Sequence, residues 1–448
     1  MNSAWLRGPG SQAGEPLDLI LGLLIIFVGA RAAGEVMEKL HQSPMIGEVL
    51  AGILLGPMVL GLINPDPTTS FGESLNVVAN LGVFILVLLA GIELGREGLR
   101  KAFKERSMVV AIVEFFLPFS LGYSLAAALG LTFSQSLFLG TAMAVTALPV
   151  SVRILLDLNL LNSRLGRAIV SVALVNDLVA FAMLGLVVQF TSLGTTTPEG
   201  LTIGLVALNN VLFVGLVFCV ATILKLTTHL GRNSESYMQT LVSKLRGQEA
   251  SFALCISTAL GLGAAAELLG IHFAVGAFYG GLLMTPQLLG QVQFNRVRNA
   301  VSSVTFGLFA PVFFAYVGLK FSITFTAWPL ILGITAIAFI GKLLGGLMGG
   351  FVAGFRGAPL LALGVGLNAR GMMELLLAQV GLATGIIDTN LYSALVIMTL
   401  TTTLCTPPIL KRLLRRFTLD DVLPRVPRPL AIGGIESSSL TPSDETAR

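Results

Sequence analysis

The residues best suited to chemistry are Asn176 and Asp177, which are adjacent in the apolar stretch 171–183. A carboxylate inside a membrane-spanning helix is costly, so such residues are rare and face a bundle interior or a water-filled path. The alternative is a structural carboxylate whose hydrogen bonds are satisfied within the bundle. Because an intramembrane ionisable residue marks a functional site by default, the sequence predicts that Asp177 is the functional group.

A carboxylate in this setting can hold either a proton or a monovalent cation, because hard cations prefer oxygen ligands. Either occupant neutralises the site, and a neutral site crosses a low-dielectric barrier more easily than a bare carboxylate. Competition between a proton and Na+ or K+ for the same oxygens would therefore give obligatory exchange. Besides water and backbone carbonyls, the candidate ligands are Asp177, Asn176, Thr141 and Thr146.

Two apolar segments carry helix-breaking residues, one in each half of the chain. Pro149 lies in the segment 141–153, where it removes a backbone donor and clashes with the preceding turn. The segment 364–374 contains Gly and Asn residues, which are weak helix formers, at mid-membrane depth. The alternative is a simple kink at Pro149 and close helix packing at the glycines. Paired interruptions are typical of an inverted-repeat transporter site, so we expect two broken helices.

Three further charges lie deep in apolar segments: Lys342, Arg370 and Glu374. Lys342 and Arg370 can compensate the C-terminal ends of broken helices, and Glu374 can offset an N-terminal end. Structural charge balancing is an equal alternative for all three. Glu114 also lies in an apolar segment, and we expect it to be structural or membrane-facing, without a role in the site.

The composition places these residues in a polytopic membrane protein. The chain has 448 residues, of which 54% are hydrophobic and 12% charged, against about 25% charged in soluble domains. Its mean hydropathy is +0.86, which excludes a soluble enzyme core. The apolar runs are continuous, which excludes a β-barrel, and most are close to the ~20 residues that span a bilayer as a helix. The expected spans are 17–38, 44–62, 74–95, 107–130, 134–156, 165–190, 201–226, 248–269, 271–288, 303–319, 325–354, 357–383 and 389–410.

The basic residues fall almost entirely in the loops that follow odd-numbered spans, with Lys320 as an exception. By the positive-inside rule, this alternation predicts an N-terminus outside and a C-terminus in the cytoplasm. The expected organisation is an extracytoplasmic segment 1–16, a transmembrane domain 17–410 with interleaved core and dimerisation parts, and a short cytoplasmic tail 411–448.

Several stretches together resemble bacterial monovalent cation:proton antiporters of the Kef and Nap type. They include 44–57, 89–94, 141–155, 173–181, 270–278, 313–318, Gly341-Lys342 and 368–374, in family order. The resemblance implies a thirteen-helix, inverted-repeat sodium/proton antiporter-like fold with two interrupted crossing helices, usually a homodimer. It also implies that the carboxylate at Asp177 binds proton and cation alternately.

The same resemblance bears on stoichiometry. In electrogenic exchangers of this group a second Asp occupies the position of Asn176, and the lysine matching Lys342 pairs with it. Asn176 therefore implies an unpaired Lys342 and one-for-one, electroneutral exchange. The chain lacks the C-terminal nucleotide-binding domain of the Kef branch, so gating by such ligands is not expected.

The predicted function is alternating-access exchange of Na+ or K+ for H+ in the bacterial inner membrane. We expect no enzyme activity, no cofactor apart from the transported ions and no nucleic-acid partner. A sodium-coupled organic-anion symporter of related fold remains the alternative, although it needs a larger polar pocket. A channel lacks a repeated carbonyl-filter sequence, and an intramembrane enzyme lacks a paired Ser/His or His-Glu-x-x-His arrangement.

Overall fold

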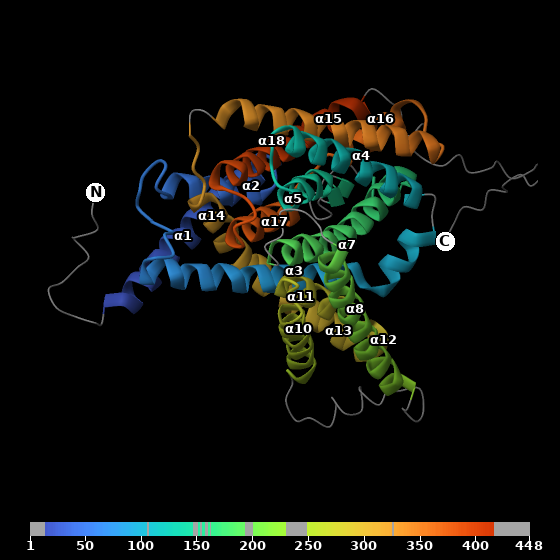
Figure 1. The fold of residues 1–448 in the computed structure, drawn as a ribbon, viewed down its shortest axis with the longest axis horizontal. Helices are drawn as coiled ribbons and strands as arrows, with labels where there is room; N and C mark the ends of the chain where they lie inside the picture. The colour runs from blue at the N-terminus through green and yellow to red at the C-terminus, as the bar shows by residue number, and fades with distance from the viewer. Residues whose placement is uncertain are drawn as a thin grey trace, which may run out of the picture.

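The computed structural model describes residues 14–104, 107–146, 151–152, 155–156, 160–161, 163–192, 200–229, 249–324 and 327–415. Within these ranges the regular structure is helical and contains no β-strand (Figure 1). The described helices are α1 (Gly14–Lys39), α2 (Pro44–Leu55), α3 (Ser70–Lys104), α4 (Ser107–Ala128), α5 (Phe133–Ala144), α7 (Arg164–Ser192), α8 (Gly200–His229), α10 (Ala250–Leu268), α11 (Phe273–Leu283), α12 (Pro286–Leu289), α13 (Gln291–Val304), α14 (Ala310–Leu319), α15 (Trp328–Val352), α16 (Gly357–Gly366), α17 (Met372–Ala383) and α18 (Thr389–Arg415).

Every predicted span contains helix within the described ranges. Nine helical segments there are long and apolar enough to cross a membrane, and four shorter apolar helices accompany them. The tenth predicted span starts earlier than expected, because α13 continues through a short π-helical turn, Thr305–Phe309, into α14. The twelfth predicted span is divided into α16 and α17. The chain is therefore a multi-pass membrane protein, as its composition predicts.

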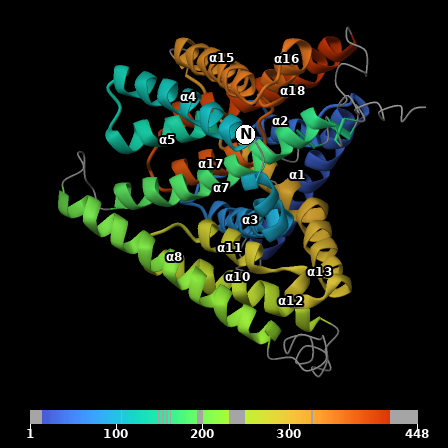
Figure 2. The same ribbon diagram turned by 90° about the vertical axis from the view of Figure 1, so that its right-hand side faces the viewer.

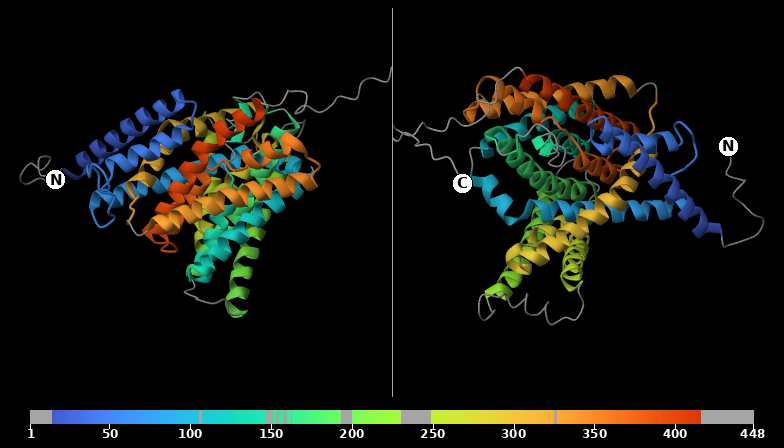
Figure 3. Two further views of the ribbon diagram at one scale, coloured as in Figure 1. Left: turned by 90° about the horizontal axis from the view of Figure 1, so that it is seen from above. Right: turned by 180° about the vertical axis from the view of Figure 1, so that it is seen from behind.

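The helices pack as two bodies (Figures 1 and 2). In the first, which we call the core body, α4 packs on α5 and α15, α7 packs on α4 and α5, and α18 packs on α15, α16 and α17. In the second, the scaffold body, α3 and α10 pack on α11, and α2 packs on α1 and α14. Helix α7 contacts α3 and α11 and so joins the two bodies. Figure 3 shows the helical bundle from above and from behind.

Close glycine packing fixes the two scaffold helices that face α7. A Cβ added at Gly91 of α3 would lie 2.1 Å from the carbonyl oxygen of Phe278, and one at Gly281 of α11 would lie 2.3 Å from that of Leu88. Neither approach leaves room for a side chain, because both obstacles are backbone atoms. Helices α3 and α11 therefore form one tightly joined wall.

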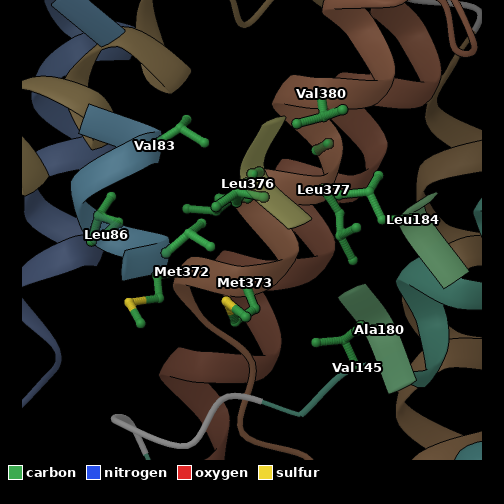
Figure 4. Close-up of a cluster of buried hydrophobic side chains, with 14 of the residues drawn as sticks. Val83, Leu86, Val145, Ala180, Leu184, Met372, Met373, Leu376, Leu377 and Val380 are labelled. Carbon is green, nitrogen blue, oxygen red and sulfur yellow. The ribbon is translucent and has the colours of Figure 1, made fainter. Parts of the chain in front are cut away.

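Helix α17 is held between the two bodies by apolar side chains. Figure 4 shows Met372, Leu376 and Val380 beside Val83 and Leu86 of α3, with Ala180 and Leu184 of α7 on the other side. These side chains are buried in the largest apolar cluster of the described residues. Because lipid tails are themselves apolar, such packing stabilises the bundle through van der Waals contact. The start of α17 is thereby fixed beside α3 and α7.

Candidate functional site

The site is built at two interruptions in transmembrane helices. Helix α5 ends at Ala144, and Val145 is extended with φ −68° and ψ 144°. The chain is helical again at Ser151 and Val152, while Pro149 lies outside the described residues. In the second interruption, α16 ends at Gly366 and α17 begins at Met372. The predicted division of the twelfth span is thus confirmed, and α5 stops where the first break is expected.

The two interruptions meet, because Arg370 of the second reaches the end of α5. Its guanidinium donates to the carbonyl oxygens of Ala142 at 2.9 Å and Met143 at 2.8 Å, and it forms a 2.7 Å ion pair with Glu374. These carbonyls belong to the last turn of α5, where backbone acceptors lack helical partners and the helix dipole is negative. Glu374 lies in the first turn of α17, at the positive end of that helix.

Lys342 also binds the C-terminal end of α5, and it has an ion-pair partner that the sequence did not reveal. Its ammonium donates to the carbonyl oxygen of Ala144 and lies 2.5 Å from Glu114 Oε1. Both charged side chains are fully buried. The expectation of an unpaired Lys342 is therefore wrong. Of the two alternatives for Glu114, the structure excludes the membrane-facing one and agrees with a structural residue. The partner comes from α4 rather than from position 176 on α7.

The sequence shows that Glu114 lies in an apolar span, but it does not show whether the side chain faces protein or lipid. Glu114 is an acid in an apolar span, and burying its charge in the membrane costs as much free energy as burying the charge of Asp177. Helix α4 is apolar on every side, however, and hydropathy does not identify which face is covered by protein. Only the packing of α4 against α15 places Glu114 beside Lys342.

Asn176 and Thr146 complete this buried network. Asn176 Nδ2 donates to Glu114 Oε2 at 2.5 Å and to Thr146 Oγ1 at 3.1 Å. The Thr146 hydroxyl donates to Glu114 Oε1 at 3.0 Å, and it accepts from Lys342 Nζ at 2.6 Å. Both oxygens of Glu114 thus receive donors, as a buried carboxylate requires. We call Glu114, Lys342, Asn176 and Thr146 the brace.

Asp177 has different surroundings from its neighbour. It is 6% exposed, and its Oδ1 atom has no hydrogen-bond partner among the described residues. The side chain lines a small pocket that also contains Ala90, Glu93 and Leu94 of α3, Leu174 of α7, Phe278 of α11 and Met372 of α17. The pocket therefore lies where the core body meets the scaffold body. Among the residues that line the pocket, Glu93 is the second carboxylate.

The four predicted ligands do not gather around one point. Asn176 and Thr146 belong to the brace, and neither lines the pocket of Asp177. The hydroxyl of Thr141 donates to the carbonyl oxygen of Leu137, one turn earlier in its own helix, at 2.8 Å. Of the predicted set, Asp177 is the member that lines the pocket.

The charges of the site can be counted from these contacts. Lys342 neutralises Glu114, and Arg370 neutralises Glu374. Asp177 is left as a buried carboxylate without an ion-pair partner among the described residues. Such an oxygen can accept a proton or coordinate a cation that enters the pocket.

A polytopic helical bundle with two interrupted helices and an unpaired carboxylate at their meeting point defines a class of membrane transporter. The sodium/hydrogen exchanger transmembrane family model matches residues 22–416, and the chain belongs to this family. The resemblance to monovalent cation:proton antiporters is thereby confirmed.

Individual relatives and structures agree with this membership. The chain is 29% identical over 395 residues to an Na+/H+ antiporter of Enterococcus hirae, covering 87% of this chain and 97% of that protein. It is 29% identical over 400 residues to the Na+/H+-K+ antiporter GerN of Bacillus cereus, covering 88% and 96%. The sodium proton antiporter MjNhaP1 of Methanocaldococcus jannaschii superposes with a TM-score of 0.61 at 17% identity, covering 90% and 97%. The last likeness confirms the predicted fold class.

Proposed function

We propose that the chain exchanges Na+ or K+ for H+ across a bacterial inner membrane by alternating access, with Asp177 binding proton and cation in turn. The single observation that carries this proposal is the buried, unpaired Asp177 in a pocket between two helical bodies. The relatives from Enterococcus hirae, an Na+/H+ antiporter, and Bacillus cereus, an Na+/H+-K+ antiporter, support both cations as substrates.

The position of Asp177 supports alternating access. Asp177 and Met372 belong to the core body, while Glu93, Leu94 and Phe278 belong to the scaffold body. A displacement of one body against the other therefore changes the wall of the pocket without breaking the helix that carries Asp177. Such rocking around a site at a repeat interface is the general mechanism of this transporter architecture.

The charge count supports a one-for-one exchange. The Glu114–Lys342 and Arg370–Glu374 pairs are neutral and lie wholly inside the core body, so its movement leaves both intact. Asp177 then carries one proton in one direction or one monovalent cation in the other. No net charge crosses the membrane in a complete cycle, which makes the exchange electroneutral.

We also infer a homodimer, as the family resemblance implies, with its N-terminus outside and its C-terminus in the cytoplasm. The orientation follows from the basic loops of the sequence, since lysine and arginine are retained on the cytoplasmic side. In this orientation the C-terminal end of α3 and the amphipathic helix α13 face the cytoplasm.

The first test is Asp177→Asn, which keeps the size of the side chain and removes its negative charge. In proteoliposomes with an imposed pH gradient, adding Na+ or K+ should dissipate the gradient for the wild type. The variant should lose this flux by about a hundredfold or more, because its site binds no cation in exchange for a proton. Asp66→Asn, the same change in an exposed loop, is the matched control and should retain wild-type flux. Near-normal flux in Asp177→Asn would refute the site.

The second test concerns stoichiometry. Wild-type flux with Na+ should be the same with and without a membrane potential imposed by a gradient of thiocyanate, a permeant anion that is not an exchanged cation. A rate or end point that follows the imposed potential would show that net charge moves, and it would refute one-for-one exchange while leaving Asp177 as the site.

A further inference from the structure

Glu93 shares the pocket of Asp177 but belongs to the other body. It lies on α3, in the wall that Gly91 joins closely to α11, whereas Asp177 lies on α7. Its side chain is exposed, in contrast to the buried Asp177. Glu93 therefore occupies the mouth of the pocket, with Asp177 at its buried end.

A bend in α3 leaves this mouth of the pocket uncovered. Two residues after Glu93, Gly95 adopts φ 51° and ψ 163°, and an added Cβ there would meet nothing within 4 Å. A positive φ is easily adopted by glycine, so the helix turns away from its axis at this point. Figure 1 shows the last part of α3 leaving the direction of its first part. The segment beyond Gly95 therefore does not continue along the axis past Glu93.

The mouth of the pocket lies at the end of the membrane span that is nearest to the basic loops. Glu93 stands at the end of its membrane span, directly before Arg96, Arg100, Lys101 and Lys104. Arg298 lies on α13, which packs on α3, and its side chain is exposed. A negative charge in a recess with low-dielectric walls raises the local concentration of cations. Glu93 supplies a negative charge that attracts the cation at the entrance, next in the sequence to these basic residues.

We propose that Glu93 collects the monovalent cation at the basic-loop side and delivers it to Asp177, and that it acts on this side alone. The inference rests on the proposed antiport. Glu93 stays with the scaffold body when the core body moves, so it is separated from Asp177 when the pocket opens to the opposite side. The two faces of the transporter consequently differ in their dependence on this one charge.

The test is the apparent KM for Na+ measured separately from each side of the membrane, in everted and right-side-out vesicles. Glu93→Gln should raise the KM about three- to tenfold from the basic-loop side, as expected for one partly screened charge near the site. The KM from the opposite side and the maximal rate from both sides should stay at wild-type values. Glu93→Asp keeps the charge and should retain most of the wild-type KM.

Two further variants sharpen the test. Glu73→Gln removes an exposed acid near the other end of α3 and should leave the KM from the basic-loop side unchanged. Arg298→Gln removes the opposing positive charge and should lower that KM. Raising ionic strength with choline chloride should raise the wild-type KM more than that of Glu93→Gln.

A KM of Glu93→Gln that is unchanged from both sides, or raised equally from both sides, would overturn the inference while wild-type exchange continued. An equal effect on both faces would mark Glu93 as structural. Absence of any cation-dependent proton flux in the wild type would instead overturn the proposed antiport, and this inference with it.

Discussion

Asn176 and Asp177 are neighbours on α7, yet they belong to two regions with opposite properties. Asn176 points into the brace, where its amide nitrogen donates to both Glu114 and Thr146. Asp177 lines a pocket, and its Oδ1 atom has no partner among the described residues. Asn176 Oδ1, like Asp177 Oδ1, has no partner among the described residues, so the contrast lies in charge and in donated bonds. Asn176 is neutral and its amide nitrogen is bonded to the brace, whereas Asp177 is a carboxylate that lines the pocket. The contrast shows how one helix supports both a fixed frame and an exchangeable site.

The difference lies in which helices cover each side of α7. The brace is made by α4, α7 and α15 and by Thr146, which follows the end of α5, all in the core body. The pocket adds α3 and α11 from the scaffold body. Groups that must keep their charge partners are placed inside one body, while the group that must exchange its partner is placed between two. Variants of the brace should therefore alter stability, whereas Asp177→Asn should alter transport.

The largest expected effect on stability follows from Lys342→Met, which removes the cation of the brace and leaves Glu114 buried without its ion-pair partner. Breaking a buried ion pair in this way costs about 3–5 kcal/mol. Thermal unfolding of the purified protein in detergent should show a clear fall in Tm. Lys39→Met, at an exposed helix end, is the control and should leave the Tm unchanged.

A second substitution in the same background separates charge loss from packing loss. Adding Glu114→Gln to Lys342→Met removes the stranded charge, so the double variant should recover part of the lost Tm. Equal or additive losses would contradict the ion pair as the source of the effect.

The sequence predicted the fold well because the signals for it are local. Runs of about twenty apolar residues identify the spans, and Gly364, Gly366, Asn368 and Gly371 identify the division of the twelfth. The short π-helical turn after α13 was not predicted, since no residue there breaks the apolar pattern.

The site was only partly predictable, because pairing depends on contacts between distant helices. Asp177 and Arg370 stand out as charges in apolar segments, and the structure places both at the meeting point of the interruptions. By resemblance, a partner of Lys342 was expected only at position 176, where Asn176 implied an unpaired lysine, but the partner is Glu114, 228 residues away in the sequence. Only tertiary packing decides between carboxylates on α4 and α7.

Thr146→Val is expected to have an intermediate effect. Its hydroxyl accepts from Lys342 and Asn176 and donates to Glu114, so valine leaves these buried groups with one partner fewer. A lost partner of a buried polar group costs about 1–3 kcal/mol. The Tm should fall by less than in Lys342→Met, and the KM for Na+ should change little, because Thr146 does not line the pocket. A many-fold rise in KM at unchanged Tm would instead make Thr146 a cation ligand.

Thr141→Val should have the smallest effect, and it tests the sequence prediction directly. Thr141 was predicted as a ligand, but its hydroxyl donates to Leu137 in the preceding turn. Replacing such a bond within one helix by a methyl group of similar size changes stability by less than about 1 kcal/mol, because the carbonyl keeps its backbone partner. Flux and KM should therefore match the wild type. If Thr141→Val raised the KM more than Thr146→Val, the end of α5 would have to turn towards Asp177 during transport, and the division between brace and pocket would hold for one state of the cycle alone.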